Sequence, residues 1–273
     1  MLRPPHRAYR RLYTYHFNRR VMPDLSHDPD CIGLWQEHDT AIYFFHDARD
    51  EEMEKLATAT GATLFYRADL DYRDWEAGQE IAPFTVGHLR IAPVWDANGG
   101  DIVLDPGVVF GSGFHPTTRL CLEGMLELLA LRPARRLIDL GTGSGLLAVA
   151  GAKLGVASVF ACDFNPLACR VAQANCHRNN VAVDIACLDL FASFPGRQSD
   201  ILVANLHLEL LLHLFTQPAF RQQDFLILAG FRAAQEEKLL AALPTADLRL
   251  IDRRQQDGWC RWILRRRDSV TGN

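Results

Sequence analysis

The segment LIDLGTGSG at 137–145 constrains the fold more than any other part of the chain. An apolar run that contains one acid, Asp139, stops at three closely spaced glycines, Gly141, Gly143 and Gly145. The residues that follow, LLAVAGAKLG, have the apolar spacing of a helix. Strand, glycine turn and helix predict the start of a βαβ unit. Its turn lets the backbone approach a ligand closely, and its helix start offers free N–H donors.

The spacing of the glycines separates two classes of cofactor. A dinucleotide fingerprint reads G-x-G-x-x-G, whereas here the third glycine comes one residue early. A second apolar strand, Ser158–Asp163, ends in an acid that is placed to accept hydrogen bonds from both hydroxyls of a ribose. A ribose site beside a tight glycine loop, without a clear phosphate site, favours a nucleoside cofactor such as S-adenosylmethionine (SAM). The same spacing disfavours a NAD-dependent oxidoreductase.

Strands and helices are predicted to alternate through the second half of the chain. The predicted strands are 136–140, 158–163, 183–188, 201–204 and 225–229, and the helices between and after them are 146–154, 166–179, 208–215 and 234–243. Two strand-like runs, LRLIDRR and WCRWILRR, close the chain. Five βα repeats followed by two consecutive strands predict an α/β fold, a doubly wound sheet with an antiparallel closing hairpin. This hairpin is typical of SAM-dependent methyltransferases rather than dehydrogenases.

The first part of the chain has a different pattern. Residues 1–74 are predicted to form a small α+β domain, with a strand near 12–20, two short strands around a Glu-His-Asp turn, and a helix at 49–60 that stops at Gly61. Residues 75–105 form a linker with bridging strands, and 106–273 form the methyltransferase domain. An amphipathic helix is expected to start at Pro116 and to run to about Leu131.

Composition excludes several classes of function. A net charge of −4 gives no overall field for nucleic acid or anionic membranes, and no stretch approaches the ~20 uncharged apolar residues of a membrane span. None of the seven cysteines forms a C-x-x-C pair, so we expect reduced thiols, no metal site and a cytoplasmic protein. The first 20 residues mix arginines with aromatic residues, which is compatible with RNA contacts. An edge strand behind a basic tail is the interpretation we favour.

Ligand residues should lie at the carboxyl ends of the strands. The candidates, in chain order, are Asp139 with Gly141, Asp163, Leu188 with Asp189, and Asn205. Asn205 ends the fully apolar strand ILVAN, where it either caps the following helix or binds the substrate. In the glycine-rich stretch upstream, Phe110 and Phe114 either cover a flat base or fill a hydrophobic seam.

Five strings, DPGVVFGSGFHPTT, LIDLGTGSGLLAVAGAKLG, FACDFNPLA, ILVANLHLEL and GWCRWILRR, together resemble the ribosomal protein methyltransferase family PrmA, which modifies large-subunit ribosomal protein eleven. The resemblance implies a loop that wraps the cofactor, formed by Phe110, Gly111, Gly113 and Thr117. It also implies that Asp163 and Phe164 hold the ribose and the adenine, and that Asn205 lies beside the methyl group. It further implies a βαββαβ substrate domain at the N-terminus.

The chain departs from this family at its N-terminal domain. Between the first strand-like stretch and Cys31 there are only ten residues, mostly polar, with Pro23 and Pro29, which leaves no room for the family's first helix. We expect a SAM-dependent methyltransferase acting on a lysine or N-terminal amine of a protein, with a large-subunit ribosomal protein as first candidate. The alternatives are a diverged enzyme with a non-ribosomal protein acceptor and a non-catalytic SAM-binding protein. A nucleic-acid amino-methyltransferase typically carries N-P-P-[YF], whereas Asn205 is followed by Leu-His.

Overall fold

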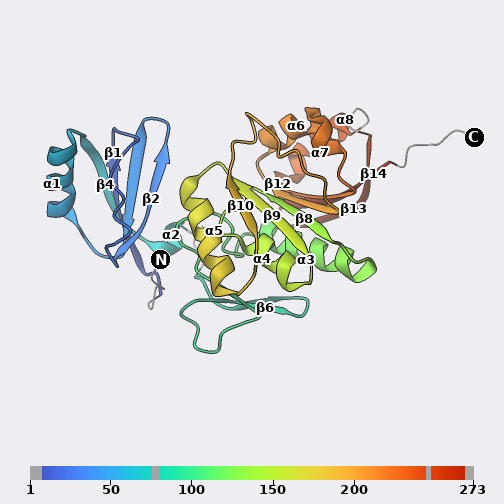
Figure 1. The fold of residues 1–273 in the computed structure, drawn as a ribbon, viewed down its shortest axis with the longest axis horizontal. Coiled ribbons are helices and arrows are strands. Elements are labelled where there is room, and N and C mark those ends of the chain that lie inside the picture. The colour runs from blue at the N-terminus through green and yellow to red at the C-terminus, as the bar shows by residue number, and fades with distance from the viewer. Residues whose placement is uncertain (1–7, 76–79, 244–246, 268–273) are drawn as a thin grey trace, which may run out of the picture.

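The computed structural model describes residues 8–75, 80–243 and 247–267. The start of the arginine-rich segment, part of the predicted linker at 76–79 and the last six residues lie outside this description. The described chain forms three sheets, of four, seven and three strands. Helix α5, Pro166–Arg178, lies between the N-terminal sheet and the seven-stranded sheet (Figure 1).

The seven-stranded sheet has the order β10-β9-β8-β11-β12-β14-β13. Its strands are β8 Arg136–Leu140, β9 Ser158–Asp163, β10 Asp184–Cys187, β11 Ile201–Asn205, β12 Phe225–Arg232, β13 Leu248–Gln256 and β14 Trp259–Arg266. The first five are parallel, and β14 pairs antiparallel with both β12 and β13. The doubly wound sheet and its closing hairpin are therefore confirmed. The count of five βα repeats was wrong, because irregular chain at 188–200, not a helix, follows β10.

Helices cover both faces of this sheet. One face packs against α3, α4 and α5, and the other against α6, α7 and α8. These helices are α3 Pro116–Leu131, α4 Leu146–Lys153, α6 Leu208–Thr216, α7 Pro218–Arg221 and α8 Glu236–Ala242, the last preceded by a short 3-10 turn, Ala233–Gln235. Because strands buried on both faces need apolar side chains throughout, the sequence of β11 is continuously apolar before Asn205.

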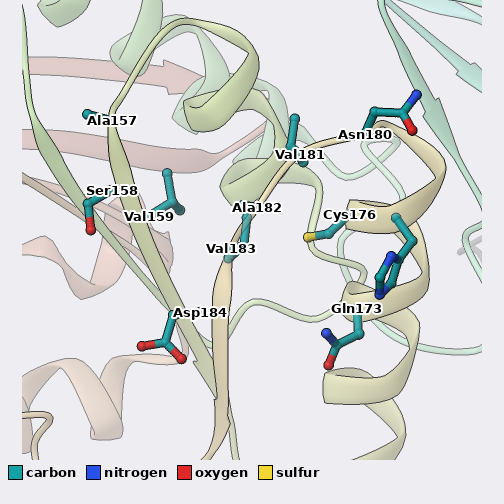
Figure 2. A pocket seen from close by; sticks show the side chains of 11 residues that line it. Ala157, Ser158, Val159, Gln173, Cys176, Asn180, Val181, Ala182, Val183 and Asp184 are labelled. Atoms are coloured by element: carbon teal, nitrogen blue, oxygen red, sulfur yellow. The ribbon is translucent and has the colours of Figure 1, made fainter.

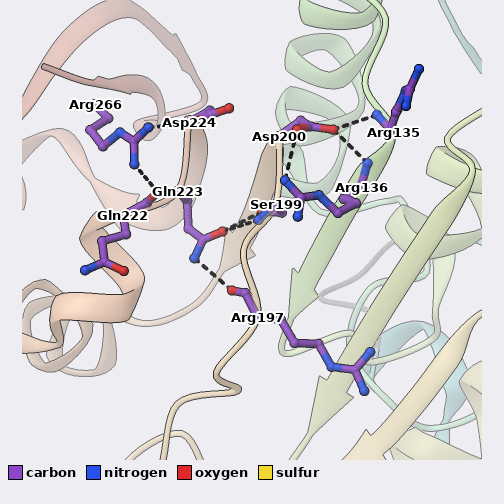
Figure 3. A network of polar contacts seen from close by, with 9 residues as sticks. All are labelled: Arg135, Arg136, Arg197, Ser199, Asp200, Gln222, Gln223, Asp224 and Arg266. Atoms are coloured by element: carbon purple, nitrogen blue, oxygen red, sulfur yellow. Dashed lines mark hydrogen bonds and ion pairs between the residues drawn. The ribbon is translucent and has the colours of Figure 1, made fainter. Parts of the chain in front are cut away.

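Polar contacts fix the amino ends of the central strands (Figure 3). The Asp200 carboxylate accepts the backbone N–H groups of Arg135 and Arg136 at 2.7 and 2.9 Å. Gln223 Oε1 accepts the N–H and the hydroxyl of Ser199 at 2.6 and 2.8 Å. Since these contacts hold β8, β11 and β12 at one end, the opposite ends, where the glycine loop lies, are free to form a ligand site.

The N-terminal sheet has the order β2-β3-β1-β4 with antiparallel neighbours. It comprises β1 Arg11–Phe17, β2 Cys31–Glu37, β3 Thr40–Phe45 and β4 Leu64–Asp71, with α1 Asp50–Thr60 on one face and α2 Tyr72–Trp75 after β4. Residues 18–30, between β1 and β2, contain no helix, as predicted. Met22 and Leu25 of this segment instead pack in the same cluster as Met53 of α1. The loop thus covers part of the face that α1 leaves open.

The predicted linker forms the third sheet, β5 Phe84–Val86, β6 Leu89–Pro93 and β7 Ile102–Leu104. Its apolar residues Ile91 and Ile102 are buried in the core that α3 and α4 share with the seven-stranded sheet. This segment therefore packs on the catalytic half, and the domain boundaries given above stay a prediction. Within the described ranges, no helix combines the length and apolarity needed to cross a membrane.

Candidate active site

The glycine loop between β8 and α4 has the backbone geometry that its sequence predicts. Gly141, Gly143 and Gly145 have φ values of +71°, +53° and +83°, a region that other residues rarely adopt. A Cβ atom on Gly143 would collide with the carbonyl oxygen of Phe110. The Ser144 N–H donates to that same oxygen at 2.9 Å. An upstream loop, residues 105–115, thus lies directly on the glycine loop, and we call it the cofactor loop.

Asp139 is fully buried at the carboxyl end of β8. Its Oδ2 accepts the Thr142 hydroxyl at 2.7 Å, while its Oδ1 accepts no hydrogen bond. Burial raises the pKa of Asp139 to about 7; the Thr142 hydroxyl opposes this shift and the nearby charge of Asp163 adds to it. A buried carboxylate oxygen without a donor is energetically costly. The site therefore suits a ligand that brings a donor, above all a cationic one.

Asp163 is buried at the end of the neighbouring strand β9. Its Oδ2 accepts the Gly143 N–H and its Oδ1 accepts the Asn165 N–H, both at 3.0 Å. Burial raises the pKa of this carboxyl, and the two backbone amides oppose the shift. Each oxygen keeps a lone pair for a further donor. Binding of ribose hydroxyls stays a prediction, and the contact that orders the glycine loop is a second role that the sequence did not reveal.

Asn205 ends β11, the strand beside β8. Its Nδ2 donates to the Thr118 hydroxyl at 3.3 Å, and its Oδ1 is buried without a hydrogen bond. Helix α6 begins at Leu208 with His207 as its N-cap residue and no side-chain cap, so the alternative that Asn205 caps this helix is wrong. The amide oxygen of Asn205 is available to a ligand.

Two phenylalanines near the strand ends differ from a third in exposure. Phe110 and Phe164 are 53% and 55% exposed, and their contact with a flat base stays a prediction. Phe114 is buried against Phe84, with ring centroids 5.5 Å apart, and therefore fills a hydrophobic seam. Gly113 packs against the same Phe84 ring, which a Cβ atom would strike.

A cluster of aromatic and cationic side chains extends from the cofactor loop to the closing hairpin. The His115 ring lies 5.3 Å from Phe110 and 4.6 Å from Trp259, and Arg232 stacks on Trp259 at 4.3 Å. Burial lowers the pKa of His115, and the charge of Arg232 lowers it further, so this imidazole is neutral at pH 7. Its Nδ1 lies 2.7 Å from the hydroxyl of Thr117, which is fully buried. Trp259 and Arg232 were not among the candidates from the sequence, and their contacts place them next to His115 of the cofactor loop.

The remaining candidates have structural contacts of their own. The Leu188 N–H donates to the Asp163 carbonyl at 2.9 Å, which places the chain after β10 beside β9. The exposed Asp189 carboxylate accepts the Phe191 N–H at 2.9 Å and so stabilises a turn. Contact of either residue with a cofactor stays a prediction.

A pocket elsewhere on the molecule is separate from this site. It is lined by the starts of β9 and β10 and the end of α5, including Ser158, Asp184 and Cys176 (Figure 2). These residues lie at the amino ends of the strands. Cofactors of doubly wound sheets bind at the carboxyl ends, so this pocket is not the predicted cofactor site.

The geometry fits a nucleoside cofactor that also carries a cationic group. Two buried side-chain oxygens in the described part of the chain accept no hydrogen bond, Asp139 Oδ1 and Asn205 Oδ1, and they end adjacent strands. The Asp163 carboxylate lies on the other side of β8, and the exposed rings of Phe110 and Phe164 lie near the same strand ends. SAM has an ammonium group, a ribose and an adenine. Its ammonium and hydroxyl groups can donate the hydrogen bonds that these side-chain oxygens lack.

Comparison with known proteins identifies the family. The model of the family described as "Ribosomal protein L11 methyltransferase (PrmA)" matches residues 17–267. The ribosomal protein L11 methyltransferase of Symbiobacterium thermophilum is 36% identical over 78% of this chain and 76% of its own, and that of Pseudomonas putida W619 is 35% identical over 90% and 86%.

A solved structure supports the same assignment. The crystal structure of a ribosomal protein L11 methylase from Lactobacillus delbrueckii subsp. bulgaricus has a TM-score of 0.61 and 29% identity. It covers 68% of this chain and 100% of that one. The resemblance inferred from the sequence is thereby confirmed, and the chain belongs to the ribosomal protein L11 methyltransferase family, PrmA.

Proposed function

We propose that this chain transfers methyl groups from SAM to amino groups of ribosomal protein L11, on lysine side chains or the N-terminus. The observation that carries the proposal is the pair of unpartnered oxygens, Asp139 Oδ1 and Asn205 Oδ1, at the ends of two adjacent strands. Asp139 would take the ammonium of SAM, and Asn205 would take an N–H of the acceptor amine. A protein that only binds SAM would not need an amide oxygen for the acceptor amine, so this role of Asn205 argues against the non-catalytic alternative.

Different residues around the glycine loop would bind different parts of SAM. Asp163 would accept the ribose hydroxyls, while Phe110 and Phe164 would border the adenine. Gly141, Gly143 and Gly145 let the backbone approach the methionine part of the molecule. Bound SAM supplies an activated methyl group on a good leaving group, so the chain's remaining tasks are to align the acceptor and to exclude water.

The acceptor amine must be neutral to react. A free lysine has a pKa of about 10.4, and its ammonium has no lone pair. A partly buried site that already holds positive charge, such as the Arg232 guanidinium, favours the neutral amine. The Asn205 oxygen would accept one N–H of this amine and so direct its lone pair. Alignment of the amine is thus the contribution that we assign to Asn205.

Asp139 makes the binding of SAM depend on pH. Because burial raises the pKa of Asp139 to about 7, the free protein carries a partly protonated carboxyl at neutral pH. A bound ammonium favours the carboxylate, so binding releases a proton from Asp139, and its contribution to affinity grows as the pH rises through about 7. Calorimetry at pH 7 in buffers of different ionisation enthalpy should show a larger proton release in the parent protein than in Asp139→Asn. Equal release in both proteins would contradict this role.

The class of cofactor can be tested by thermal unfolding. SAM and its demethylated product should each raise the melting temperature, because ligands that bind only the folded state stabilise it. NAD and ATP should leave it unchanged. A rise with NAD that equals the rise with SAM would overturn the cofactor assignment, and with it the proposed reaction.

A further inference from the structure

Two tyrosines of the N-terminal part of the chain, one buried and one half-buried, hold the beginning of the cofactor loop. Tyr72, the first residue of α2 directly after β4, donates its hydroxyl to the carbonyl oxygen of Gly107 at 2.5 Å. Tyr9, just before β1, donates its hydroxyl to Asp105 Oδ1 at 2.8 Å. Tyr72 is only 3% exposed. The start of β1 and the end of β4, which lie side by side in the sheet, are therefore both linked to one short stretch of the cofactor loop.

This stretch is tied in turn to the glycine loop through one side chain of α5. Asn175 Oδ1 accepts the Asp105 N–H at 2.9 Å, and Asn175 Nδ2 donates to the carbonyl oxygens of Asp105 and Ser144, both at 2.8 Å. Ser144 in turn donates its N–H to the Phe110 carbonyl and its hydroxyl to the Gly111 carbonyl. A continuous set of hydrogen bonds thus leads from Tyr9 to the glycine loop.

Apolar packing supports the same stretch. Val108 and Val109 of the cofactor loop are buried in one cluster with Leu12 of β1 and Leu167 of α5. The sheet approaches α5 so closely that a Cβ atom on Gly33 would lie 2.6 Å from a methyl carbon of Leu167. The N-terminal sheet, the cofactor loop and the first turn of α5, which follows Asp163, therefore pack as one body.

The Tyr72 contact is buried, and the Tyr9 contact is partly buried within a group of aromatic rings. Tyr9 stacks on His46 at 4.7 Å and lies 4.8 Å from Tyr72 and 5.4 Å from Trp95, so rings that flank the N-terminal sheet and the three-stranded sheet meet here. Burial raises the pKa of Asp105, and the Tyr9 hydroxyl opposes this shift. Because the Tyr72 hydroxyl bonds in a buried position, its loss leaves the Gly107 carbonyl without a ready replacement.

We propose that Tyr9 and Tyr72 are positioning residues for SAM, which act through the cofactor loop and make the N-terminal domain part of the support of the cofactor site. The inference rests on the proposed function, since it assigns these residues to the binding of SAM. It also has a consequence for the acceptor. The N-terminal domain and the SAM site would both depend on the cofactor loop. A protein bound to that domain should therefore change the affinity for SAM, and SAM should change the affinity for that protein by the same factor.

The test removes single hydroxyl groups and compares them with a matched control. Tyr72→Phe and Tyr9→Phe each delete one hydrogen bond to the cofactor loop. Tyr43→Phe deletes an equivalent bond within the N-terminal part, because the buried Tyr43 hydroxyl donates to the Pro23 carbonyl at 2.5 Å and does not contact the loop. Calorimetry should show about three- to tenfold weaker SAM binding for the first two variants and unchanged binding for the third.

A second measurement separates positioning from general destabilisation. Hydrogen exchange of the amides at 107–115 and 143–145 should be faster in Tyr72→Phe and Tyr9→Phe than in Tyr43→Phe, and the turnover rate at saturating SAM should stay within about twofold of the parent. SAM affinities and exchange rates that equal those of Tyr43→Phe would overturn the inference. Failure of the parent protein to bind SAM would instead overturn the proposed function, so the two failures are distinguishable.

Discussion

Replacement of Asp163 by alanine is expected to weaken the binding of SAM at least about tenfold. The variant loses the acceptors for the ribose hydroxyls, each worth about 1–3 kcal/mol when charged. It also leaves the Gly143 N–H without the carboxylate that now holds it at 3.0 Å, so the glycine loop loses part of its order before the ligand arrives. Titration calorimetry of parent and variant measures the difference directly.

A matched control for this variant lies at the opposite end of the neighbouring strand. Asp184 begins β10, is exposed, and pairs with Arg197 at 2.7 Å far from the glycine loop. Asp184→Ala should bind SAM with the affinity of the parent. If Asp163→Ala also keeps the parent affinity, Asp163 does not hold the ribose and the cofactor assignment of β9 is wrong.

Asn205→Ala should lower the turnover rate about ten- to hundredfold while the affinity for SAM stays within about threefold of the parent. The side chain touches Thr118, and its oxygen accepts nothing in the free protein, so its expected partner is the acceptor amine. An interaction made chiefly with the reacting amine affects the transition state more than the binding of the cofactor. Steady-state kinetics with calorimetry of SAM binding separate the two effects.

We expect the Asn205→Ala variant to fold like the parent protein, because Asn205 does not cap α6. Thr118→Val serves as the control, since it removes the neighbour of Asn205 Nδ2 but keeps the Asn205 oxygen. Its turnover rate should fall less than that of Asn205→Ala. An Asn205→Ala variant with the parent's turnover rate would show that another group aligns the acceptor.

The central sheet and the region of the site followed from local patterns in the sequence. Periodicity located each strand of the sheet, and the carboxyl ends of parallel strands always meet at one edge. Asp139, Asp163 and Asn205, each at the end of a predicted strand, could therefore be assigned to one site. The positive φ values at Gly143 and Gly145 follow from the same spacing of glycines.

Contacts between segments that are distant in the sequence could not be predicted in this way. Trp259 reaches the site only because the closing hairpin places β14 beside β12, where Trp259 pairs with Arg232. The Tyr72 hydroxyl meets Gly107 because the N-terminal sheet packs against the cofactor loop and α5. No local pattern distinguishes these aromatic side chains from ordinary core residues.

The missing helix after β10 shows a second limit. Five strands were counted as five βα units, although no helix was predicted between the strands 183–188 and 201–204. Residues 188–200 instead form turns, and their contacts, such as that of Asp189 with Phe191, are too local to leave a periodic signal. A repeat can therefore be inferred from a sequence only where its own helix has an apolar face.

Mass spectrometry of the acceptor tests the central claim most directly. The chain is incubated with SAM and ribosomal protein L11 from a strain that lacks the modification, with rRNA and the other ribosomal proteins offered in the same reaction, and with Asn205→Ala as a parallel sample. We predict that the mass of L11 rises by multiples of one methyl group and that these groups lie on amino nitrogens. The Asn205→Ala variant should add them more slowly. Methyl groups found only on another protein or on RNA, with L11 unchanged, would contradict the account.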